Sequence, residues 1–262
     1  MPQSVLSVRR DGGRVRVRLT RPDVRNAFNA ELIAALRETF AALAEDTSAR
    51  CVILEGDGKT FCGGADINWM RASLDLQYEA NVGDAERMSD MFRAIDNCPK
   101  PVVARVHGAA LGGGAGLAAV CDIAIATDDA IFGFTEVKLG IIPAVISPFV
   151  LGKIGASHAR ALFLTGERFD AQRAWSIGLV HEVVHEDALD GVVDAIADEF
   201  DSAGPHAVSA AKELIREVRA VSYDASRTLT ARALAKARVS DEGQEGLRAF
   251  LERRRAAWVV AP

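Results

Sequence analysis

One acidic residue of the 262-residue chain lies in an apolar setting that suits proton transfer. Glu136 belongs to the segment IFGFTEVKLGII, in which phenylalanine, valine, leucine and isoleucine surround it in sequence. Because burial among apolar groups disfavours a charged carboxylate, we expect the pKa of Glu136 to be raised. A carboxyl group with a raised pKa can donate and accept protons near neutral pH. A carboxylate that pairs with Lys138, or one that lies at the surface, is an equally good interpretation of the pattern alone.

Two glycine-rich segments could place backbone N–H groups against the same reacting atom. They are FCGGADI at 61–67 and LGGGAGLA at 111–118, and each follows an apolar run that predicts a strand. Glycine allows close approaches and backbone angles that other residues rarely adopt. Two free N–H groups that face one point form an oxyanion hole, which stabilises negative charge on a carbonyl oxygen. Glycine turns also occur where a chain only changes direction, so the spacing leaves both interpretations open.

Two motifs for binding phosphate or dinucleotides are matched only in part by this chain. The segment GDGKT contains the Gly-Lys-Thr of a P-loop, but Ile53 stands where that motif requires its first glycine. Gly114–Ala119 fits a GxGxxA dinucleotide fingerprint, and Glu136 lies twenty positions after its second glycine. In that fingerprint the acid ends the second strand of a βαβ unit, whereas Glu136 follows two short predicted strands and a loop. A nucleotide-dependent oxidoreductase therefore remains a minor alternative.

Alternating strand and helix patterns predict an α/β protein whose character changes near residue 200. Strands are expected at 4–8, 14–19, 51–56, 102–108, 122–127, 130–134 and 180–184. Helices are expected at 30–46 after an Asn29 cap, at 75–96, just after the glycine run, and over most of the chain from Ser157 onward. We therefore expect an α/β core over 1–200 and a helical region over 201–262, with a boundary near Pro205.

Composition excludes several classes of partner. The net charge is −5 and the chain has no basic tail, so a nucleic-acid partner is not expected. No apolar segment is long enough to cross a bilayer, and the N-terminus lacks the apolar region of a signal peptide, so we expect a cytoplasmic protein without a membrane partner. The four cysteines form no CxxC pair, which favours reduced thiols over disulfides or a metal site.

Five segments together resemble the crotonase, or enoyl-CoA hydratase/isomerase, superfamily. They are RNAFN, FCGGADI, VHGAALGGGAGLAAVCDIAIA, FGFTEVKLGIIP and LTGERFDAQRAWSIGLVHEVV, and they follow one another in the family's order over nearly the whole chain. The resemblance implies an α/β fold built as a crotonase-like spiral of β–β–α units, with a helical C-terminal trimerisation region. It implies homotrimers or dimers of trimers that act on acyl-CoA thioesters. Coenzyme A would be part of the substrate, and no separate cofactor is expected.

The same resemblance assigns roles to individual residues of this chain. It places the oxyanion-hole N–H groups on Ala65 and Gly113 and the general acid/base on Glu136. Its other implied contacts are Arg25, Asn26 and Ala27 along the CoA, Asp66 and Ile67 with Ala65 at the adenine end, and Phe250 and Arg253 from the stretch FLERRRAAW, reaching CoA from a neighbouring subunit. Trp69 follows the Ala65 loop closely, so it either walls the acyl pocket or is a packed aromatic side chain. His107 could border the site, although a structural histidine is favoured.

One position departs from the pattern of two-glutamate hydratases in this family. Those hydratases usually carry a second glutamate where this chain has Gly116. One hypothesis is therefore a Δ3,Δ2-enoyl-CoA isomerase, in which a single carboxylate moves a proton between two carbons. Another is a CoA-binding relative with little turnover. The favoured hypothesis is a hydratase acting on a branched glutaconyl-type CoA, because ADINWM and KLGIIPAVISPFV most resemble bacterial methylglutaconyl-CoA hydratases of leucine breakdown.

Overall fold

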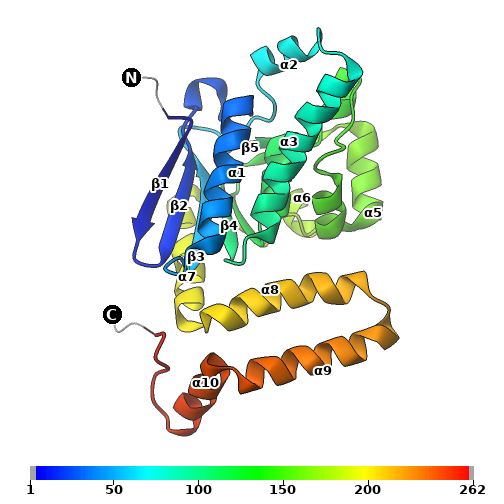
Figure 1. The fold of residues 1–262 in the computed structure, drawn as a ribbon. Helices are drawn as coiled ribbons and strands as arrows, with labels where there is room; N and C mark the ends of the chain where they lie inside the picture. The colour runs from blue at the N-terminus through cyan, green and yellow to red at the C-terminus, as the bar shows by residue number, and fades with distance from the viewer. Residues whose placement is uncertain (1–3, 260–262) are drawn as a thin grey trace.

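A six-stranded sheet forms the centre of the protein, and helices lie on both of its faces (Figure 1). The computed structural model describes residues 4–259. The strands lie in the order β1 (Leu6–Asp11), β2 (Arg14–Leu19), β3 (Cys51–Gly56), β4 (Val102–Val106), β6 (Ile123–Thr127) and β9 (Glu182–Val184). β1 and β2 form an antiparallel hairpin, and every later neighbouring pair is parallel. The expected α/β class is thus confirmed.

A smaller sheet of three short strands lies beside the large one. It contains β5 (Ala109–Leu111), β7 (Ile131–Gly133) and β8 (Arg168–Asp170), in that order. β5 directly follows β4 and leads into helix α4 (Gly113–Val120). β7 directly follows β6 and leads into the 3-10 helix η2 (Glu136–Leu139) and helix α5 (Ser147–Thr165). Each unit therefore runs from the large sheet to the small sheet and then into a helix, which is the repeated β–β–α order expected of the spiral.

The first long helix shows how local sequence builds the layers. Helix α1 (Ala30–Glu45) begins where the Asn29 side chain accepts a hydrogen bond from the Leu32 N–H at 2.9 Å, as its predicted role as N-cap requires. The buried side chains of α1 recur at helical spacing and form one face: Leu32, Ile33, Leu36, Phe40 and Leu43. This face packs against the main core, together with helix α3 (Tyr78–Asn97).

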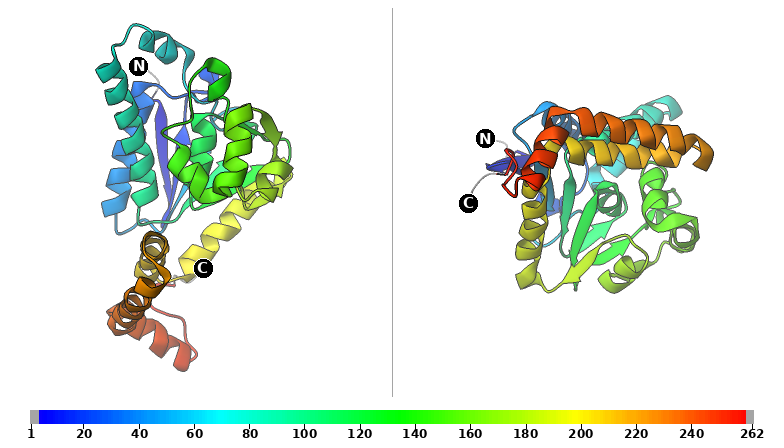
Figure 2. Two further views of the ribbon diagram at one scale, coloured as in Figure 1. Left: turned by 90° about the vertical axis from the view of Figure 1, so that its right-hand side faces the viewer. Right: turned by 90° about the horizontal axis from the view of Figure 1, so that it is seen from below.

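The two faces of the large sheet are covered by different helices (Figure 2). Along β4, Val102 and Ala104 belong to the main core with α1, α3 and α4. Val103, which lies between them in sequence, instead packs with Leu189 and Val193 of α7 (Glu186–Ser202). This alternation follows from the period of two along a strand. It explains why the central parallel strands have continuous apolar sequences.

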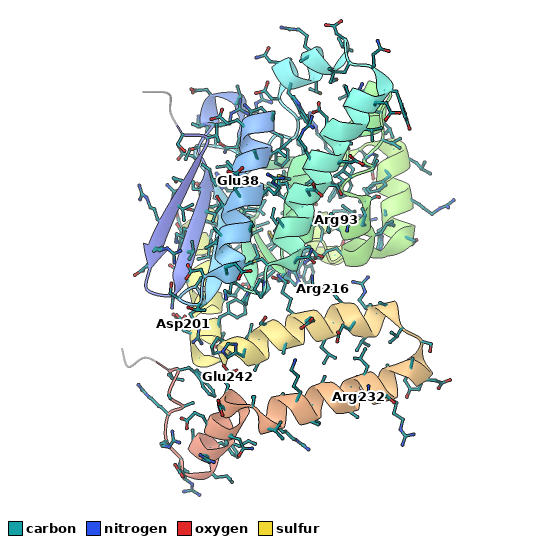
Figure 3. The ribbon with its side chains drawn as sticks, viewed as in Figure 1. Glu38, Arg93, Asp201, Arg216, Arg232 and Glu242 are labelled. Atoms are coloured by element: carbon teal, nitrogen blue, oxygen red, sulfur yellow. The ribbon has the colours of Figure 1, made fainter. Side chains whose placement is uncertain are left out.

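Three C-terminal helices lie apart from the main body of the molecule (Figures 1 and 3). They are α8 (Pro205–Ala220), α9 (Tyr223–Val239) and α10 (Asp241–Leu251), and α8 begins at the predicted boundary residue. Lys212 joins α8 to the core through an ion pair with Asp122 at 2.7 Å. The Glu242 carboxylate accepts hydrogen bonds from the first-turn N–H groups of His206 and Ala207, which ties α10 back to α8. Whether this region is a separate domain stays a prediction.

The structure adds four short elements to the predicted ones and corrects the start of a fifth. Helices α2 (Ile67–Ser73) and α6 (Ala171–Ser176) and strands β5 and β8 have three to seven residues and were absent from the predicted strands and helices, apart from the general helical expectation after Ser157. Helix α5 begins ten residues before Ser157, because Pro148 lies in its first turn, where a missing N–H is tolerated. Gly155, with φ 70° and ψ 166°, breaks this helix into two segments, and only the second was expected.

Candidate active site

The 61–65 loop runs alongside the short strand β5. The Cys62 N–H donates to the Ala109 carbonyl at 3.1 Å, and the Leu111 N–H donates to the Cys62 carbonyl, also at 3.1 Å. A parallel bridge joins Cys62 to Ala110 between these two hydrogen bonds. The loop therefore behaves as an additional parallel partner of β5. The residues that follow it emerge beside the residues that follow β5.

Strand β7 is paired with β5 on its other side. Leu111 is the register partner of Gly133, and the Gly112 N–H donates to the Gly133 carbonyl at 2.8 Å. Three parallel segments thus end at one edge, and each delivers a predicted functional group there. Ala65 follows the first segment, Gly113 follows β5, and Glu136 follows β7.

The backbone N–H groups of Ala65 and Gly113 are both available to a ligand. The backbone of Phe28 is hydrogen-bonded to the residues on either side of Ala65 and leaves the Ala65 N–H free. The Phe28 N–H donates to the Gly64 carbonyl at 2.7 Å, and the Phe28 carbonyl accepts from the Asp66 N–H at 2.8 Å. Gly113 is the first residue of α4, where N–H groups have no partner inside the helix. Among residues 4–259, no acceptor is bonded to either N–H, and both residues line the same pocket.

Two glycines are required for this close arrangement. Gly64 has φ +94°, and a Cβ there would lie 2.8 Å from the Leu111 carbonyl oxygen. At Gly114 a Cβ would lie only 2.1 Å from the Cys62 carbonyl oxygen, which is closer than any real Cβ contact. The glycine-rich segments therefore allow the loop, β5 and the first turn of α4 to approach one another.

Glu136 presents an unpaired, buried carboxyl oxygen to this edge. Its Oε2 atom is buried and has no hydrogen-bond partner among the described residues, and no described ion pair includes Glu136, so the alternative of a pair with Lys138 is wrong. Burial raises the pKa of the Glu136 carboxyl above its ordinary value, as the sequence predicted. The Oε1 atom lies beside Gly112, where an added Cβ would approach it to 3.2 Å.

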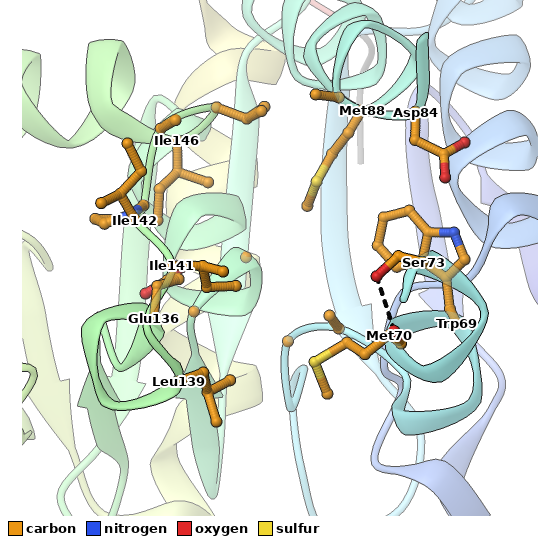
Figure 4. A pocket seen from close by; sticks show the side chains of 18 of the residues that line it. Trp69, Met70, Ser73, Asp84, Met88, Glu136, Leu139, Ile141, Ile142 and Ile146 are labelled. Carbon is orange, nitrogen blue, oxygen red and sulfur yellow. Dashed lines mark hydrogen bonds between the residues drawn. The ribbon is translucent and has the colours of Figure 1, made fainter. Parts of the chain in front are cut away.

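A pocket of ≈ 370 Å³ opens between helices α2 and α3 on one side and the η2 loop on the other (Figure 4). Trp69, Met88 and Asp84 lie on the first wall, and Glu136 and Ile146 lie on the second. The remaining lining residues are Gly63, Gly64, Ala65, Met70, Ser73, Asn81, Ala85, Gly112, Gly113, Thr135, Leu139, Ile141, Ile142, Pro143, Ala144 and Val145. Most of this lining is apolar, as in small-molecule sites generally.

Gly116 is buried inside α4 and is absent from the residues that line the pocket. Ile146 lines the pocket in its place. A Cβ on residue 116 would lie 2.3 Å from Ile146 Cγ2 and 3.2 Å from Phe92 Cζ. A longer side chain at position 116, including a glutamate, therefore has no room unless Ile146 moves.

Comparison with known proteins identifies the family. The sequence pattern of the enoyl-CoA hydratase/isomerase family matches residues 9–260. The chain belongs to the enoyl-CoA hydratase/isomerase family. A putative enoyl-CoA hydratase/isomerase (crotonase) from Legionella pneumophila has the same fold, with a TM-score of 0.92 and 40% identity over 97% of this chain and 99% of that one.

Two relatives in the family are named for substrates with different acyl groups. A crotonyl-CoA hydratase of Syntrophomonas wolfei is 33% identical over 92% of this chain and 92% of its own length. A 2,3-dehydroadipyl-CoA hydratase of Escherichia coli is 32% identical over 90% of this chain and 91% of its own. Membership of this enzyme family removes the oxidoreductase alternative. The GxGxxA glycines open α4 after a strand of the small sheet and do not belong to a dinucleotide-binding βαβ unit.

Three of the residues predicted to contact CoA are buried beside the site in this family member. The Asn26 side chain is fully buried, and its Nδ2 donates to the carbonyls of Asp57 at 2.8 Å and Thr60 at 2.7 Å. Asp66 is also buried and accepts a hydrogen bond from Arg21 Nη2 at 2.7 Å. Ala27 is buried beside them. The side chains of Asn26 and Asp66 thus hold the loops in place.

Other predicted CoA contacts lie at the surface. Arg25, with φ 57°, and Ile67 are exposed near the Ala65 loop. Phe250 and Arg253 are exposed at the end of α10, which lies at the opposite end of the molecule from α2 (Figure 1). The structure therefore does not bring Phe250 and Arg253 to the pocket of their own chain. A contact from a neighbouring subunit remains a prediction.

The remaining titratable candidates have structural surroundings. His107 Nε2 donates to the Gly58 carbonyl at 2.9 Å, and its ring is absent from the pocket lining. The four cysteines are buried free thiols, and burial raises the pKa of Cys62 to about 12, so this thiol stays protonated beside the site. Residues 4–259 hold no cluster of three or more potential metal-ligating His, Cys, Asp or Glu side chains, and none of their helices meets the length and hydropathy needed to span a membrane.

Sequence reasoning missed most of the lining residues, among them Asp84, Met88 and Ile146. Asp84 and Met88 occur at helical spacing in α3, where they resemble any polar and apolar pair of an amphipathic helix. Ile146 lies in a segment that was assigned to none of the predicted strands or helices. A prediction that paired α3 with the η2 loop across the site would have been needed to find them.

Proposed function

We propose that the protein hydrates an enoyl-CoA thioester, with Glu136 as the single general acid/base. The observation that carries this proposal is that Glu136, whose buried Oε2 has no hydrogen-bond partner among the described residues, lines the same pocket as Ala65 and Gly113 with their free N–H groups. A carboxyl group with a raised pKa exchanges protons readily near neutral pH. Membership of the enoyl-CoA hydratase/isomerase family supports the substrate class.

In this mechanism the two N–H groups hold the thioester oxygen. When a nucleophile attacks C3 of the enoyl group, electrons move through the C2=C3 double bond and the thioester oxygen gains enolate charge. Hydrogen bonds from Ala65 and Gly113 stabilise that charge most where it is greatest, in the transition state. One such donor contributes roughly 2.7–4 kcal/mol in well-studied oxyanion holes.

Glu136 handles the proton of the reacting water. Its carboxylate accepts one proton from water while the oxygen bonds to C3, and the protonated carboxyl then delivers a proton to C2 as the enolate collapses. The product gains one water molecule, and the glutamate returns to its starting state. Since one carboxyl group performs both transfers in turn, this scheme needs no second acid at position 116.

An isomerase is the second candidate function, and the packing at Gly116 favours it. Ile146 fills the space that a second carboxylate would need. Moving a double bond from C3=C4 to C2=C3 requires only one proton carrier. Methylglutaconyl-type hydration remains the sequence-based hypothesis for the acyl group. A CoA-binding relative with little turnover is the third possibility.

A mass-resolved assay with wild-type protein and Glu136→Gln tests the function. Crotonyl-CoA and methylglutaconyl-CoA report hydration by a gain of one water, and a straight-chain 3-enoyl-CoA reports isomerisation by chromatographic separation from its 2-enoyl isomer, which has the same mass. We expect hydration, with a loss of about 10²–10⁴-fold in kcat for the Gln variant. Glu38→Gln, an exposed change on α1, is the control. Isomerisation without hydration would favour the second function, and unchanged turnover in Glu136→Gln would remove its catalytic role.

A further inference from the structure

The wall of the pocket opposite Glu136 carries a second acid, Asp84 (Figure 4). Asp84 and Glu136 are the charged side chains in the described lining, which includes no lysine, arginine or histidine. The other polar side chains on the α2–α3 wall include Ser73, whose hydroxyl donates to the Met70 carbonyl at 2.8 Å, and Asn81. The pocket thus combines an apolar lining with negative charge and offers no cation to a bound acyl group.

The cation nearest Asp84 lies on the other side of the wall. Arg87 forms an ion pair with Asp84, and the Arg87 side chain is 61% exposed. Arg87 and Arg37 line a separate, smaller cavity of ≈ 70 Å³, and neither lines the main pocket. Trp69 and Asp84 line both cavities, so they form the partition between them. Arg87 is consequently held behind this partition.

We propose that Asp84, together with Trp69, selects acyl-CoA substrates whose acyl groups carry no charge. An acyl chain that ended in a carboxylate would enter a largely apolar pocket without a counterion, and its charge would face that of Asp84. Burial of an unpaired charge is strongly unfavourable, and like charges at close range add to the penalty. Specificity here comes from a repulsive group as well as from shape. This inference rests on the proposed acyl-CoA function and disfavours the glutaconyl-type substrate.

A matched pair of saturated thioesters measures this selection without turnover. Pentanoyl-CoA and glutaryl-CoA have acyl chains of five carbons, and only the second ends in a carboxylate. We expect glutaryl-CoA to bind the wild-type protein at least tenfold more weakly than pentanoyl-CoA does, as measured by calorimetry. Hexanoyl-CoA and adipyl-CoA repeat the comparison with longer chains. Equal or tighter binding of the dicarboxylic thioesters would overturn the proposal, because it would require a cation in the pocket, for example one supplied by a neighbouring subunit.

Variants on α3 assign the selection to Asp84. Asp84→Asn removes the charge at constant size, and we expect the affinity ratio between pentanoyl-CoA and glutaryl-CoA to fall several-fold toward one. Asp90→Asn makes the same change on an exposed position of α3 outside the pocket and should leave the ratio as in the wild type. An unchanged ratio in Asp84→Asn would overturn the assignment.

The ion pair with Arg87 requires one further control. Asp84→Asn also frees the Arg87 guanidinium, which could itself attract a carboxylate. The double variant Asp84→Asn/Arg87→Gln removes both charges. If the ratio still falls, loss of the repulsion from Asp84 is the cause, whereas a return to the wild-type ratio would show attraction by the freed arginine and refute the proposal. Because these ratios come from binding, they remain informative even if the protein hydrates none of the enoyl-CoAs tested.

Discussion

At the scale of the single residue, burial suits Glu136 to proton transfer but destabilises the folded protein when its carboxyl is ionised. Its Oε2 is buried without a partner, and burial raises the pKa of its carboxyl. The folded protein therefore favours the protonated form more than the unfolded chain does. The protonated carboxyl of Glu136 therefore stabilises the folded protein relative to the unfolded chain. This stabilisation is fully present below the pKa of the unfolded chain, about 4.3 for a glutamate, and is lost as the pH rises through the raised pKa of the folded protein.

Glu136→Gln should consequently be more stable than the wild type at high pH. We expect the gain in unfolding free energy to be small near pH 4 and to grow as the pH rises toward 8, because the neutral amide is never ionised. Urea unfolding of both proteins at several pH values measures this difference. Glu38→Gln, whose carboxylate is mostly exposed, should show no comparable rise. A gain that stayed constant with pH would contradict the raised pKa of Glu136.

A second prediction at this scale concerns the contact between Gly116 and Ile146. Gly116→Ala would place a methyl group 2.3 Å from Ile146 Cγ2, so we expect a loss of about 1–3 kcal/mol in unfolding free energy from overpacking. Ile146→Ala opens this space, so the double variant should lose less than the sum of the single variants. Denaturant unfolding of the three proteins measures the coupling.

Gly191→Ala is the matched control for this prediction. Gly191 lies inside α7, and an added Cβ there would meet nothing within 4 Å. The substitution should stabilise the protein by about 0.5–1 kcal/mol, since alanine is the better helix former. Additive effects of the changes at 116 and 146 would show that Ile146 does not limit the space at Gly116.

At the scale of elements, the Ala65 loop depends on the pair of Asp66 and Arg21. Asp66 caps α2 through the Asn68 N–H at 2.8 Å and accepts from Arg21 Nη2 at 2.7 Å. Burial acts to raise the pKa of Asp66, but the Arg21 hydrogen bond and the cap hydrogen bonds outweigh it, so the pKa lies below the ordinary value. The stabilisation by Asp66 is thus present above an unfolded pKa of about 3.9 and is lost as the pH falls through the lowered folded pKa.

Asp66→Asn should therefore destabilise the protein most near neutral pH. Asparagine caps a helix about as well as aspartate, so the loss of about 1–3 kcal/mol reflects the partly buried Arg21 left without its carboxylate. Urea unfolding should show the difference from wild type narrowing below about pH 4. Asp129→Asn, on an exposed turn, controls for the general effect of removing a negative charge. A deficit that widened toward low pH would contradict the lowered pKa.

The elements that sequence predicted are those whose signals are local. Alternation in 14–19 specified β2, helical spacing after Asn29 specified α1, and the apolar setting of Glu136 anticipated its raised pKa. Such patterns depend on one face of a strand or helix and on caps within a few residues.

The elements that sequence missed depend on pairing at long range. Each of β5 and β8 has three residues and exists because it pairs with β7, so neither carries a recognisable period of its own. The same limit applies to Asp84 and Ile146, which become pocket residues only when α3 and the η2 loop face each other. The lack of space for a side chain at Gly116 likewise depends on a distant residue, because the side chain of Ile146 packs against Gly116.

At the scale of the whole molecule, the C-terminal helices leave large apolar side chains uncovered. Neither α8 nor α9 has a buried residue in the isolated chain. Tyr223 is 92% exposed, Phe250 81% and Leu251 78%. Exposed apolar surface on this scale is typical of an interface between proteins. It is consistent with the homotrimer that the family resemblance implies, in which Phe250 and Arg253 of one chain would lie at the CoA site of the next.

Mixed assemblies of two defective chains test this arrangement. Glu136→Gln lacks the proton carrier, and we expect Arg253→Ala to weaken acyl-CoA binding about tenfold through loss of a charged contact. In a cyclic assembly a site built from the intact Glu136 of one chain and the intact Arg253 of its neighbour is wild type. Random mixing of equal amounts should restore about a quarter of the sites, measured as kcat/KM at low substrate concentration after refolding the two chains together.

The control separates sharing of a site from a general effect of mixing. Arg253→Ala mixed with the double variant Glu136→Gln/Arg253→Ala contains no intact Arg253, so its activity per intact Glu136 should equal that of Arg253→Ala alone. If Arg253 instead acted on the pocket of its own chain, neither mixture would gain activity, because each Glu136→Gln chain would hold its intact arginine beside a defective site. The position of α10 at the end of the molecule opposite α2 favours restoration (Figure 1), since the chain cannot bring Arg253 to its own Ala65 loop without detaching its last helices.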